Sequence, residues 1–364
     1  MSSRNIENTG MVNKYSELLT VIVPTFNREK YLRRLLDYYC SCGLKAKFII
    51  LDSSETKYNV GELKQRFSAL NLQYISYPFD IVQTDKMKDG FRFIETKYSL
   101  VNPDDDFFLI PCIQESIKFL EENPKYSCAR GMDACFFKYN GQFQYNVSGD
   151  YEHHSIIFDS PIERYRQHFL HYTQTAIYAV QRTDNIIKEM NLLCLYSDDL
   201  ILAEYLWSMS SIILGKMKVF DRLYRVAQTF SPTNQYPTFR NMIVDGTFDR
   251  KFKNYKTGLC ELYENTYHEP SVELERTIDE TMKEKLESEG INYRRLKILS
   301  AIRRTINSLG LLKPCLSIKR KLFPYKFKTY QDLLNQPDVP YFDPLHPDHE
   351  EFMKIKSIIE KHGV

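Results

Sequence analysis

Two short apolar runs near the amino terminus, separated by a segment with helical spacing, limit the fold of this chain most strongly. The runs cover residues 19–23 and 46–51, and between them apolar side chains recur at helical spacing from Tyr31 to Tyr39. A strand, a helix and a second strand in this order predict an α/β domain. Polar segments follow both strands, at residues 24–28 and 52–54, where open α/β sheets bind their ligands.

The alternation of strands and helices continues to about residue 230. It predicts strands at 72–77, 98–101, 107–110, 128–139, 176–180 and 217–227, and helices at 85–95, 112–122, 183–193 and 200–214. Another helix is expected after Ser160, because Ser160, Pro161 and Glu163 form a capping box with proline at the first helical position. We therefore divide the chain into a polar lead (1–16), an α/β domain (17–230) and a mainly helical, more charged region (231–364).

Three adjacent carboxylates, Asp104, Asp105 and Asp106, lie between the apolar runs 98–101 and 107–110. Like charges this close raise each other's pKa unless a cation offsets them. Mg²⁺ and Mn²⁺ prefer oxygen ligands and often bind through one or two carboxylates together with substrate phosphates. The turn is therefore a candidate metal site. The alternative is a solvated surface turn, since Asn, Pro and Asp all favour turns.

Composition excludes several classes of function. The chain has 49 basic and 47 acidic residues, so its charge gives no reason to expect nucleic acid as a partner. It contains neither G-x-G-x-x-G nor a P-loop, no apolar leader and no run of roughly 20 apolar residues. The eight cysteines are scattered without a CxxC pair, which favours reduced thiols. We expect a cytoplasmic protein, and its oligomeric state stays open.

A basic stretch lies in the last third of the chain. Residues 294–330 include eleven Lys or Arg and no acid. On a helical projection Leu296, Leu299 and Ile302 share one face with residues 306 and 309, while basic side chains lie opposite. This pattern is typical of a helix on an anionic membrane surface, here the inner face. The alternative, equally compatible with the sequence, is a charged helix that packs its apolar side on the α/β domain.

Four features together resemble one family. They are the PTFNR segment after the first strand, Asp52 at the end of the second, the Asp104–Asp106 turn, and the acidic pair Asp198-Asp199 before a helix. Over residues 17–230 the chain resembles the family 2 glycosyltransferases of GT-A fold, of the bacterial surface-polysaccharide type. The resemblance implies a GT-A domain with a mixed, mostly parallel central sheet. It implies sugar transfer from a nucleotide-sugar donor, with UDP favoured, to a saccharide or lipid-linked acceptor, with Mn²⁺ or Mg²⁺ bound.

The resemblance also assigns nucleotide-binding residues. Pro24, Thr25, Asn27 and Arg28 would line the nucleoside pocket. Asp52 would accept from the uracil N3–H, although a turn cap is the alternative for this residue. Lys86 would lie beside the nucleotide, with Lys88 as its rival and a solvated position as the alternative for both.

In the acidic turn, Asp106 and Asp104 are the expected metal ligands, and Asp104 and Asp105 the expected nucleotide contacts. The sequence does not decide which pair of the three binds the metal. Arg225 resembles a basic residue that some members use near the diphosphate. Gln228 and Thr229 stand where a histidine is common, so a third protein ligand of the metal is open.

For the catalytic base of an inverting transfer, the resemblance favours Asp199, with Asp198 as the second choice or as a helix cap. The histidines at positions 153, 154, 168 and 171 lack the spacing of a zinc site. His171, Tyr172 and Gln174 are candidates for acceptor contacts or for ordinary polar surface.

Two other functions remain as alternatives. One is a catalytically degenerate protein that binds nucleotide sugars within a polysaccharide assembly. The other is a nucleotidyltransferase, which the lack of glycines in PTFNR disfavours, because that loop could not wrap a triphosphate.

Overall fold

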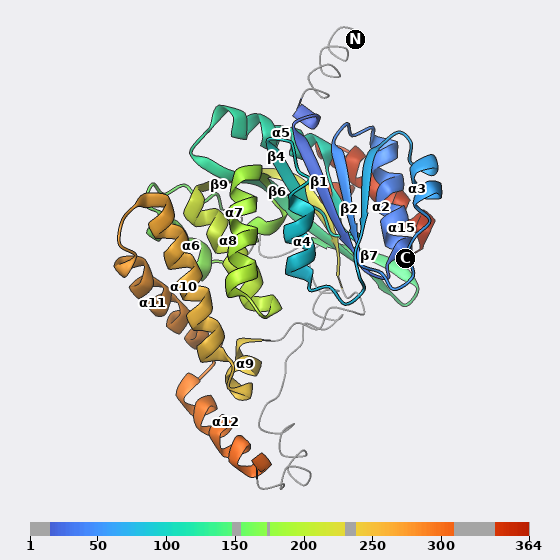
Figure 1. The fold of residues 1–364 in the computed structure, drawn as a ribbon. Coiled ribbons are helices and arrows are strands. Elements are labelled where there is room, and N and C mark those ends of the chain that lie inside the picture. Colours follow the sequence, from blue (N-terminus) through green and yellow to red (C-terminus); the bar gives the residue numbers. More distant parts are fainter. Residues whose placement is uncertain (1–14, 148–153, 173–174, 230–237, 309–338, 364) are drawn as a thin grey trace. The chain divides into compact units, whose positions relative to one another are not determined.

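The computed structural model describes residues 15–147, 154–172, 175–229, 238–308 and 339–363 (Figure 1). They form two compact units. Of the described residues, the first unit contains 15–195, 207–229 and 339–363, and the second contains 196–206 and 238–308. Each unit is described by itself.

A nine-stranded sheet with the order β3-β2-β1-β4-β8-β6-β9-β5, in which β7 pairs with β6, forms the centre of the first unit. Its strands are β1 (Leu19–Thr25), β2 (Lys47–Asp52), β3 (Asn71–Ser76), β4 (Tyr98–Val101), β5 (Phe107–Phe108), β6 (Tyr126–Tyr139), β7 (Gln142–Val147), β8 (Val180–Arg182) and β9 (Lys216–Gln228). Strands β3, β2, β1 and β4 are parallel to one another, and β6 is parallel to β9. Strand β8 pairs antiparallel with both β4 and β6, β7 pairs antiparallel with β6, and β5 pairs antiparallel with β9. The predicted mixed, mostly parallel sheet is confirmed.

Helices cover the sheet of the first unit. They are α2 (Glu29–Cys42), α3 (Val60–Arg66), α4 (Gln83–Phe91), α5 (Ile110–Glu122), α6 (Pro161–Leu170) and α7 (Thr183–Tyr196), and α8 (Leu200–Leu214) continues from the second unit into the first. Helix α6 begins as predicted, since the Ser160 side chain accepts a hydrogen bond from the Glu163 N–H at 3.3 Å. Leu32, Leu35 and Leu36 of α2 are fully buried against the sheet, which explains the helical spacing in the sequence.

One predicted strand is wrong. Residues 176–178 form a 3₁₀ turn, η1 (Ala176–Tyr178), and only the short β8 follows it. The Thr175 hydroxyl accepts a hydrogen bond from the Ile177 N–H at 3.2 Å. A side chain that binds the backbone locally in this way competes with strand pairing. The apolar composition of the segment reflects burial of Ala176 and Ile177 instead.

The end of the chain belongs to the first unit. There, η2 (Pro340–Phe342) and α15 (His349–His362) place Phe352, Ile355 and Ile359, all with no exposed surface, in the main core. Asp348 is buried and accepts from the Leu223 N–H at 2.9 Å, and it pairs with Arg222. The observed division therefore differs from a single region over 231–364, because α15 returns to the α/β core.

The second unit is helical in its described part. Besides the start of α8 it contains α9 (Phe239–Asp245), α10 (Phe248–Tyr267), α11 (Val272–Ser288) and α12 (Tyr293–Ser308). Only part of the basic stretch is described, and residues 309–330 lie outside the described chain. In α12 Leu296 is buried, whereas Ile298 and Ile302 are 62% and 50% exposed. The residues of the predicted apolar face therefore do not share one environment, because Leu296 is buried and Ile302 is exposed to solvent.

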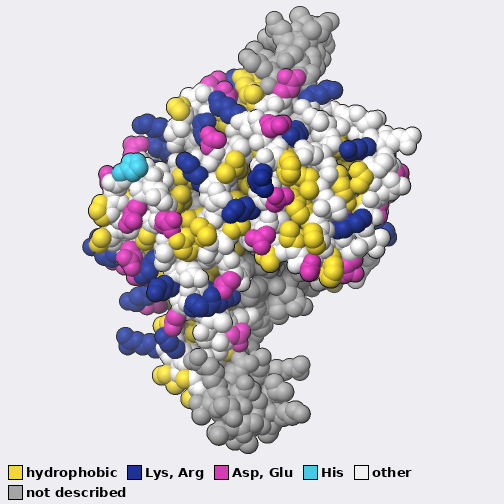
Figure 2. Space-filling view, in the orientation of Figure 1, with side chains coloured by type: hydrophobic (Ala, Val, Ile, Leu, Met, Phe, Trp, Pro, Cys, Tyr) yellow, Lys and Arg dark blue, Asp and Glu magenta, His cyan; other side chains and the backbone are white. Residues whose placement is uncertain are grey.

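The surface carries charges of both signs. On the face drawn in Figure 2, basic and acidic side chains are interspersed, in line with their nearly equal numbers. Among the helices of the described residues, we find none with the length and apolar character needed to cross a bilayer.

Candidate functional site

The loops after β1 and β2 are tied together at the carboxyl ends of these strands. Thr25 and Asp52 are register partners there. Asn27 adopts a left-handed conformation (φ 55°), which Asn tolerates better than most residues. Its N–H donates to Ser54 Oγ at 2.7 Å, and its side-chain oxygen accepts from the Glu55 N–H at 2.9 Å. The PTFNR segment thus has a fixed shape at this edge of the sheet.

Asp52 has no exposed surface, and both of its carboxylate oxygens accept hydrogen bonds within the fold. One carboxylate oxygen accepts from the Ser54 N–H at 2.8 Å and from the Ser54 hydroxyl, and the other accepts from the Tyr74 hydroxyl. These contacts are the turn cap that was the alternative for this residue. Recognition of a base by Asp52 stays a prediction.

Lys86 and Lys88, the two rivals, have different environments. Lys88 is exposed. Lys86 is buried, and its Nζ donates to Ser53 Oγ at 2.8 Å and to the Thr25 carbonyl at 3.2 Å. Burial lowers the pKa of Lys86 to about 8, although the charges of Asp52 and Asp104 oppose this shift. The structure therefore brings Lys86, and not Lys88, to the loops after β1 and β2.

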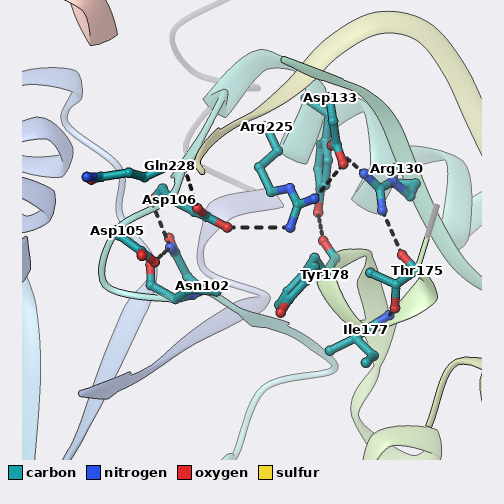
Figure 3. A network of polar contacts seen from close by, with 12 residues as sticks. Asn102, Asp105, Asp106, Arg130, Asp133, Thr175, Ile177, Tyr178, Arg225 and Gln228 are labelled. Atoms are coloured by element: carbon teal, nitrogen blue, oxygen red, sulfur yellow. Dashed lines mark hydrogen bonds and ion pairs between the residues drawn. The ribbon is translucent and has the colours of Figure 1, made fainter. Parts of the chain in front are cut away.

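The acidic turn is buried, so the solvated-turn alternative is wrong. Asp104, Asp105 and Asp106 are 3%, 7% and 6% exposed. Asn102 holds the turn from within, because its side-chain N–H groups donate to the Pro103 carbonyl at 2.6 Å and to the Asp106 carbonyl at 3.0 Å (Figure 3). Its side-chain oxygen in turn accepts from the Tyr39 hydroxyl of α2.

The β1 loop reaches the acidic turn directly. The Thr25 hydroxyl donates to Asp104 Oδ2 at 2.7 Å. Arg28 pairs with both neighbouring carboxylates, with Nε 3.4 Å from Asp104 Oδ1 and Nη2 bound to Asp105 Oδ2. These contacts bring Thr25 and Arg28 of PTFNR against two carboxylates of the Asp turn.

Asp106 points away from this loop toward β9. Its Oδ1 accepts from the Gln228 N–H at 3.1 Å, and its Oδ2 lies 3.4 Å from Nη1 of Arg225 (Figure 3). The Gln228 side chain is itself bound by Arg34 at 2.8 Å. Gln228, one of two residues that stand where the resemblance leads us to expect a histidine, therefore contributes its backbone N–H to Asp106.

Burial makes the charged forms of two of these carboxylates costly. It raises the pKa of Asp104 to about 7, with Arg28 opposing and Asp105 reinforcing the shift. It raises the pKa of Asp106 to about 8, where Arg225 opposes and Asp105 reinforces it. A bound cation would relieve both costs.

The donor set of the turn fits a hard divalent ion. All its side chains offer carboxylate oxygens, the ligands that Mg²⁺ and Mn²⁺ prefer. In the described part of the chain, no group of three or more His, Cys, Asp or Glu side chains converges as a metal site. The residues present therefore suit an ion that takes one or two carboxylates and completes its coordination with phosphate oxygens and water.

Sequence reasoning missed two members of this cluster. Asp133 of β6 lies 2.6 Å from Arg225, and Arg130 contacts the other oxygen of Asp133. Both are buried. The sequence feature that could have identified them is the presence of two opposite charges, Arg130 and Asp133, in a strand whose other side chains are mainly apolar or small.

The predicted base lies in the second unit. Asp199 Oδ1 accepts from the Leu202 N–H at 2.9 Å, which caps α8, and Oδ2 lies 3.2 Å from Lys251 Nζ. Asp198 is more exposed and pairs with Arg250. The helix cap that was considered for Asp198 is thus made by Asp199.

The described histidines do not form a metal site. His154 and His171 are exposed. His168 is buried, with Nε2 3.0 Å from Ser208 Oγ, and burial lowers its pKa to about 3. Residues 153 and 174 lie outside the described chain, so the acceptor role of Gln174 stays a prediction, as do those of His171 and Tyr172.

Comparisons with known proteins identify the fold. No family model and no curated protein matches the sequence. Among solved structures, residues 1–349 of S. aureus TarS match with a TM-score of 0.51 and 17% identity, over 80% of this chain and 79% of that chain. The same TarS segment in complex with UDP-GlcNAc gives a TM-score of 0.44 and 15% identity, over 70% and 73%. The chain therefore has a GT-A fold like that of the glycosyltransferase TarS.

Proposed function

We propose that the protein is a glycosyltransferase that moves a sugar from a nucleotide-sugar donor, with UDP favoured, to a saccharide or lipid-linked acceptor. The observation that carries this proposal is the joining of the PTFNR loop to the acidic turn, through Thr25 and Arg28 to Asp104 and Asp105. It occurs at the carboxyl ends of parallel strands, in a fold shared with TarS.

Each residue has a role in this proposal. A nucleoside at the sheet edge contacts Pro24, Thr25, Asn27 and Arg28. Asp52 accepts from the uracil N3–H, which is compatible with its existing contacts because a carboxylate offers about four lone-pair sites. The Lys86 ammonium lies beside the nucleotide, and Asp104 and Asp105 orient the ribose.

Asp106 and Asp104 would hold the metal. A bound Mn²⁺ or Mg²⁺ would offset the negative charge that develops on the leaving nucleoside diphosphate. In an inverting transfer, Asp199 takes the proton of the acceptor hydroxyl, with Asp198 as the second candidate.

Calorimetry with purified protein tests the proposal. We expect UDP and a UDP-sugar to bind, UDP-GlcNAc being the first choice, and Mn²⁺ to strengthen their binding. CDP serves as the matched control, since it carries the same ribose and diphosphate on a pyrimidine whose N3 has no proton to donate to Asp52. Failure of every nucleotide to bind, with and without Mn²⁺, would contradict the proposal.

Calorimetry together with an assay of sugar transfer and donor hydrolysis separates the alternatives. A degenerate binding protein would bind the nucleotide sugar without transferring or hydrolysing it. A nucleotidyltransferase would prefer UTP to UDP, yet the β1 loop has no glycines with which to surround a triphosphate.

We further propose that the basic stretch holds the enzyme on an anionic membrane surface. Arg294 and Arg295 are exposed beside Ile298 and Ile302 on α12, which gives both charge and apolar area. Each basic side chain near such a surface contributes on the order of 1 kcal/mol, and salt weakens the attraction.

Co-sedimentation with liposomes tests this attachment. Binding should require anionic lipid, decline in salt, and disappear when these six residues are neutralised together: Arg294, Lys297, Arg304, Lys319, Arg320 and Lys321. Equal sedimentation with neutral liposomes, or none with anionic ones, would favour packing on protein and a soluble acceptor.

A further inference from the structure

Arg225 lies in a network of buried polar contacts that includes Asp106, Asp133 and Tyr178 (Figure 3). Asp133 and Arg225 are register partners in the parallel pair β6 and β9, next to irregularities in the pairing at Met132. Irregularities of this kind redirect side chains. The Asp133 carboxylate lies 2.6 Å from Arg225 Nη2, and the 3.4 Å contact to Asp106 uses Nη1 (Figure 3).

Further contacts hold the other members of this network in place. The Tyr178 ring lies against the Arg225 guanidinium, 4.5 Å from its carbon to the ring centroid. The Tyr178 carbonyl accepts from the Tyr224 hydroxyl at 2.8 Å. Arg130 binds the other oxygen of Asp133 and donates to the Thr175 carbonyl at 2.6 Å. Arg225 is therefore held by Asp133 and Tyr178 independently of Asp106.

The distances from Arg225 to its two carboxylate partners, Asp133 and Asp106, are unequal. At 2.6 Å the pair with Asp133 is short, as expected for a charge-assisted hydrogen bond, whereas 3.4 Å to Asp106 exceeds that range. Two carboxylates therefore lie against the Arg225 guanidinium, and Asp133 makes the closer contact of the two. Without the charge of Asp133, Arg225 would pair more closely with Asp106.

We propose that Asp133 is a positioning residue that keeps Arg225 from occupying Asp106, and so leaves an oxygen of Asp106 available to a divalent cation. This inference rests on the proposed function, because Asp106 is the metal ligand there. Asp133 itself touches neither substrate nor metal. Its proposed effect on metal binding passes mainly through Arg225, which it holds at 2.6 Å.

A double-mutant cycle tests the proposal without measuring turnover. Mn²⁺ is titrated into protein that is saturated with UDP, and free Mn²⁺ is followed by electron paramagnetic resonance. Asp133→Asn keeps the shape of the side chain and removes its charge, so Mn²⁺ affinity should fall by roughly tenfold or more, as when one charge of a close buried pair is removed.

Arg225→Gln gives the opposite expectation. With the competing cation gone, Mn²⁺ should bind at least as tightly as in the parent. In this background, adding Asp133→Asn should change Mn²⁺ affinity by less than about twofold, because the interaction through Arg225 no longer exists.

Asp348→Asn is the matched structural control. Asp348 is a buried carboxylate that also pairs with an arginine of β9, Arg222, at 2.5 Å. Its replacement should lower the melting temperature and leave Mn²⁺ affinity unchanged. A positioning role for Asp133 therefore predicts a change in metal binding that a loss of stability alone does not produce.

The outcomes separate this inference from the proposed function. Unchanged Mn²⁺ affinity in Asp133→Asn, or an equal loss with and without Arg225, overturns the role of Asp133 only. If Asp133→Asn does not fold, weaker Mn²⁺ binding in Arg225→Gln is sufficient to overturn it. A parent protein that binds neither UDP nor Mn²⁺ removes the proposed function and this inference together.

Discussion

Replacement of Asp106 by alanine should abolish the Mn²⁺-stimulated binding of UDP while the fold stays intact. Asp106 is buried between the Gln228 N–H and Arg225, and burial raises its pKa to about 8. A divalent ion is the partner that makes its charged form favourable. Without the carboxylate, the ratio of UDP dissociation constants measured without and with Mn²⁺ should fall to about one, since the ion loses its main protein ligand.

The cost to the fold should be moderate. Alanine leaves the Gln228 N–H without its acceptor, at a cost of about 1–3 kcal/mol, but Arg225 keeps its contact with Asp133. Asp106→Asn provides a second variant, because its side-chain oxygen can still accept from Gln228. Asp221→Ala is the control, since Asp221 is an exposed acid on the same strand, β9. Parent-like Mn²⁺ stimulation in Asp106→Ala would show that the acidic turn is not the metal site.

The first half of the α/β core could be predicted from the sequence because local and tertiary preferences agree there. Strands β1 and β2 end within two residues of the predicted bounds, and the helical spacing from Tyr31 to Tyr39 matches the buried face of α2. Parallel strands end at one edge of a sheet, so the polar segments that follow them were expected to lie close together. The contacts of Thr25 and Arg28 with the Asp turn agree with this expectation.

The positions of Asp133 and Arg130 could not be predicted in the same way. Asp133 and its partner Arg225 are 92 residues apart, and their pairing depends on the register of β6 and β9. That register includes irregularities, which a periodic pattern does not reveal. A lone charge in a strand is equally compatible with an exposed position.

The return of helix α15 to the α/β core could not be predicted, for a different reason. Helix α15 is amphipathic, with Phe352, Ile355 and Ile359 on its buried face. Such a pattern predicts a helix that buries one side, but not which core receives it. The choice depends on specific contacts, above all those of Asp348 with Arg222 and the Leu223 N–H.

The role of Asp199 can now be tested more sharply than the sequence allowed. Its carboxylate both caps α8 and pairs with Lys251, so a loss of activity on mutation could come from structure or from chemistry. Asp199→Asn separates the two, because Asn caps a helix about as well as Asp does but cannot take a proton from the acceptor. The melting temperature should therefore change little.

In the transfer assay, Asp199→Asn should lower turnover by about 10²-fold or more while donor affinity is kept, since only proton abstraction is lost. Lys251→Met is the control: it removes the same ion pair and leaves the carboxylate in place, so most turnover should remain. An equal loss in both variants would assign the effect to the ion pair. Near-normal turnover in Asp199→Asn would move the role to Asp198 or Glu204, or exclude base catalysis by this segment.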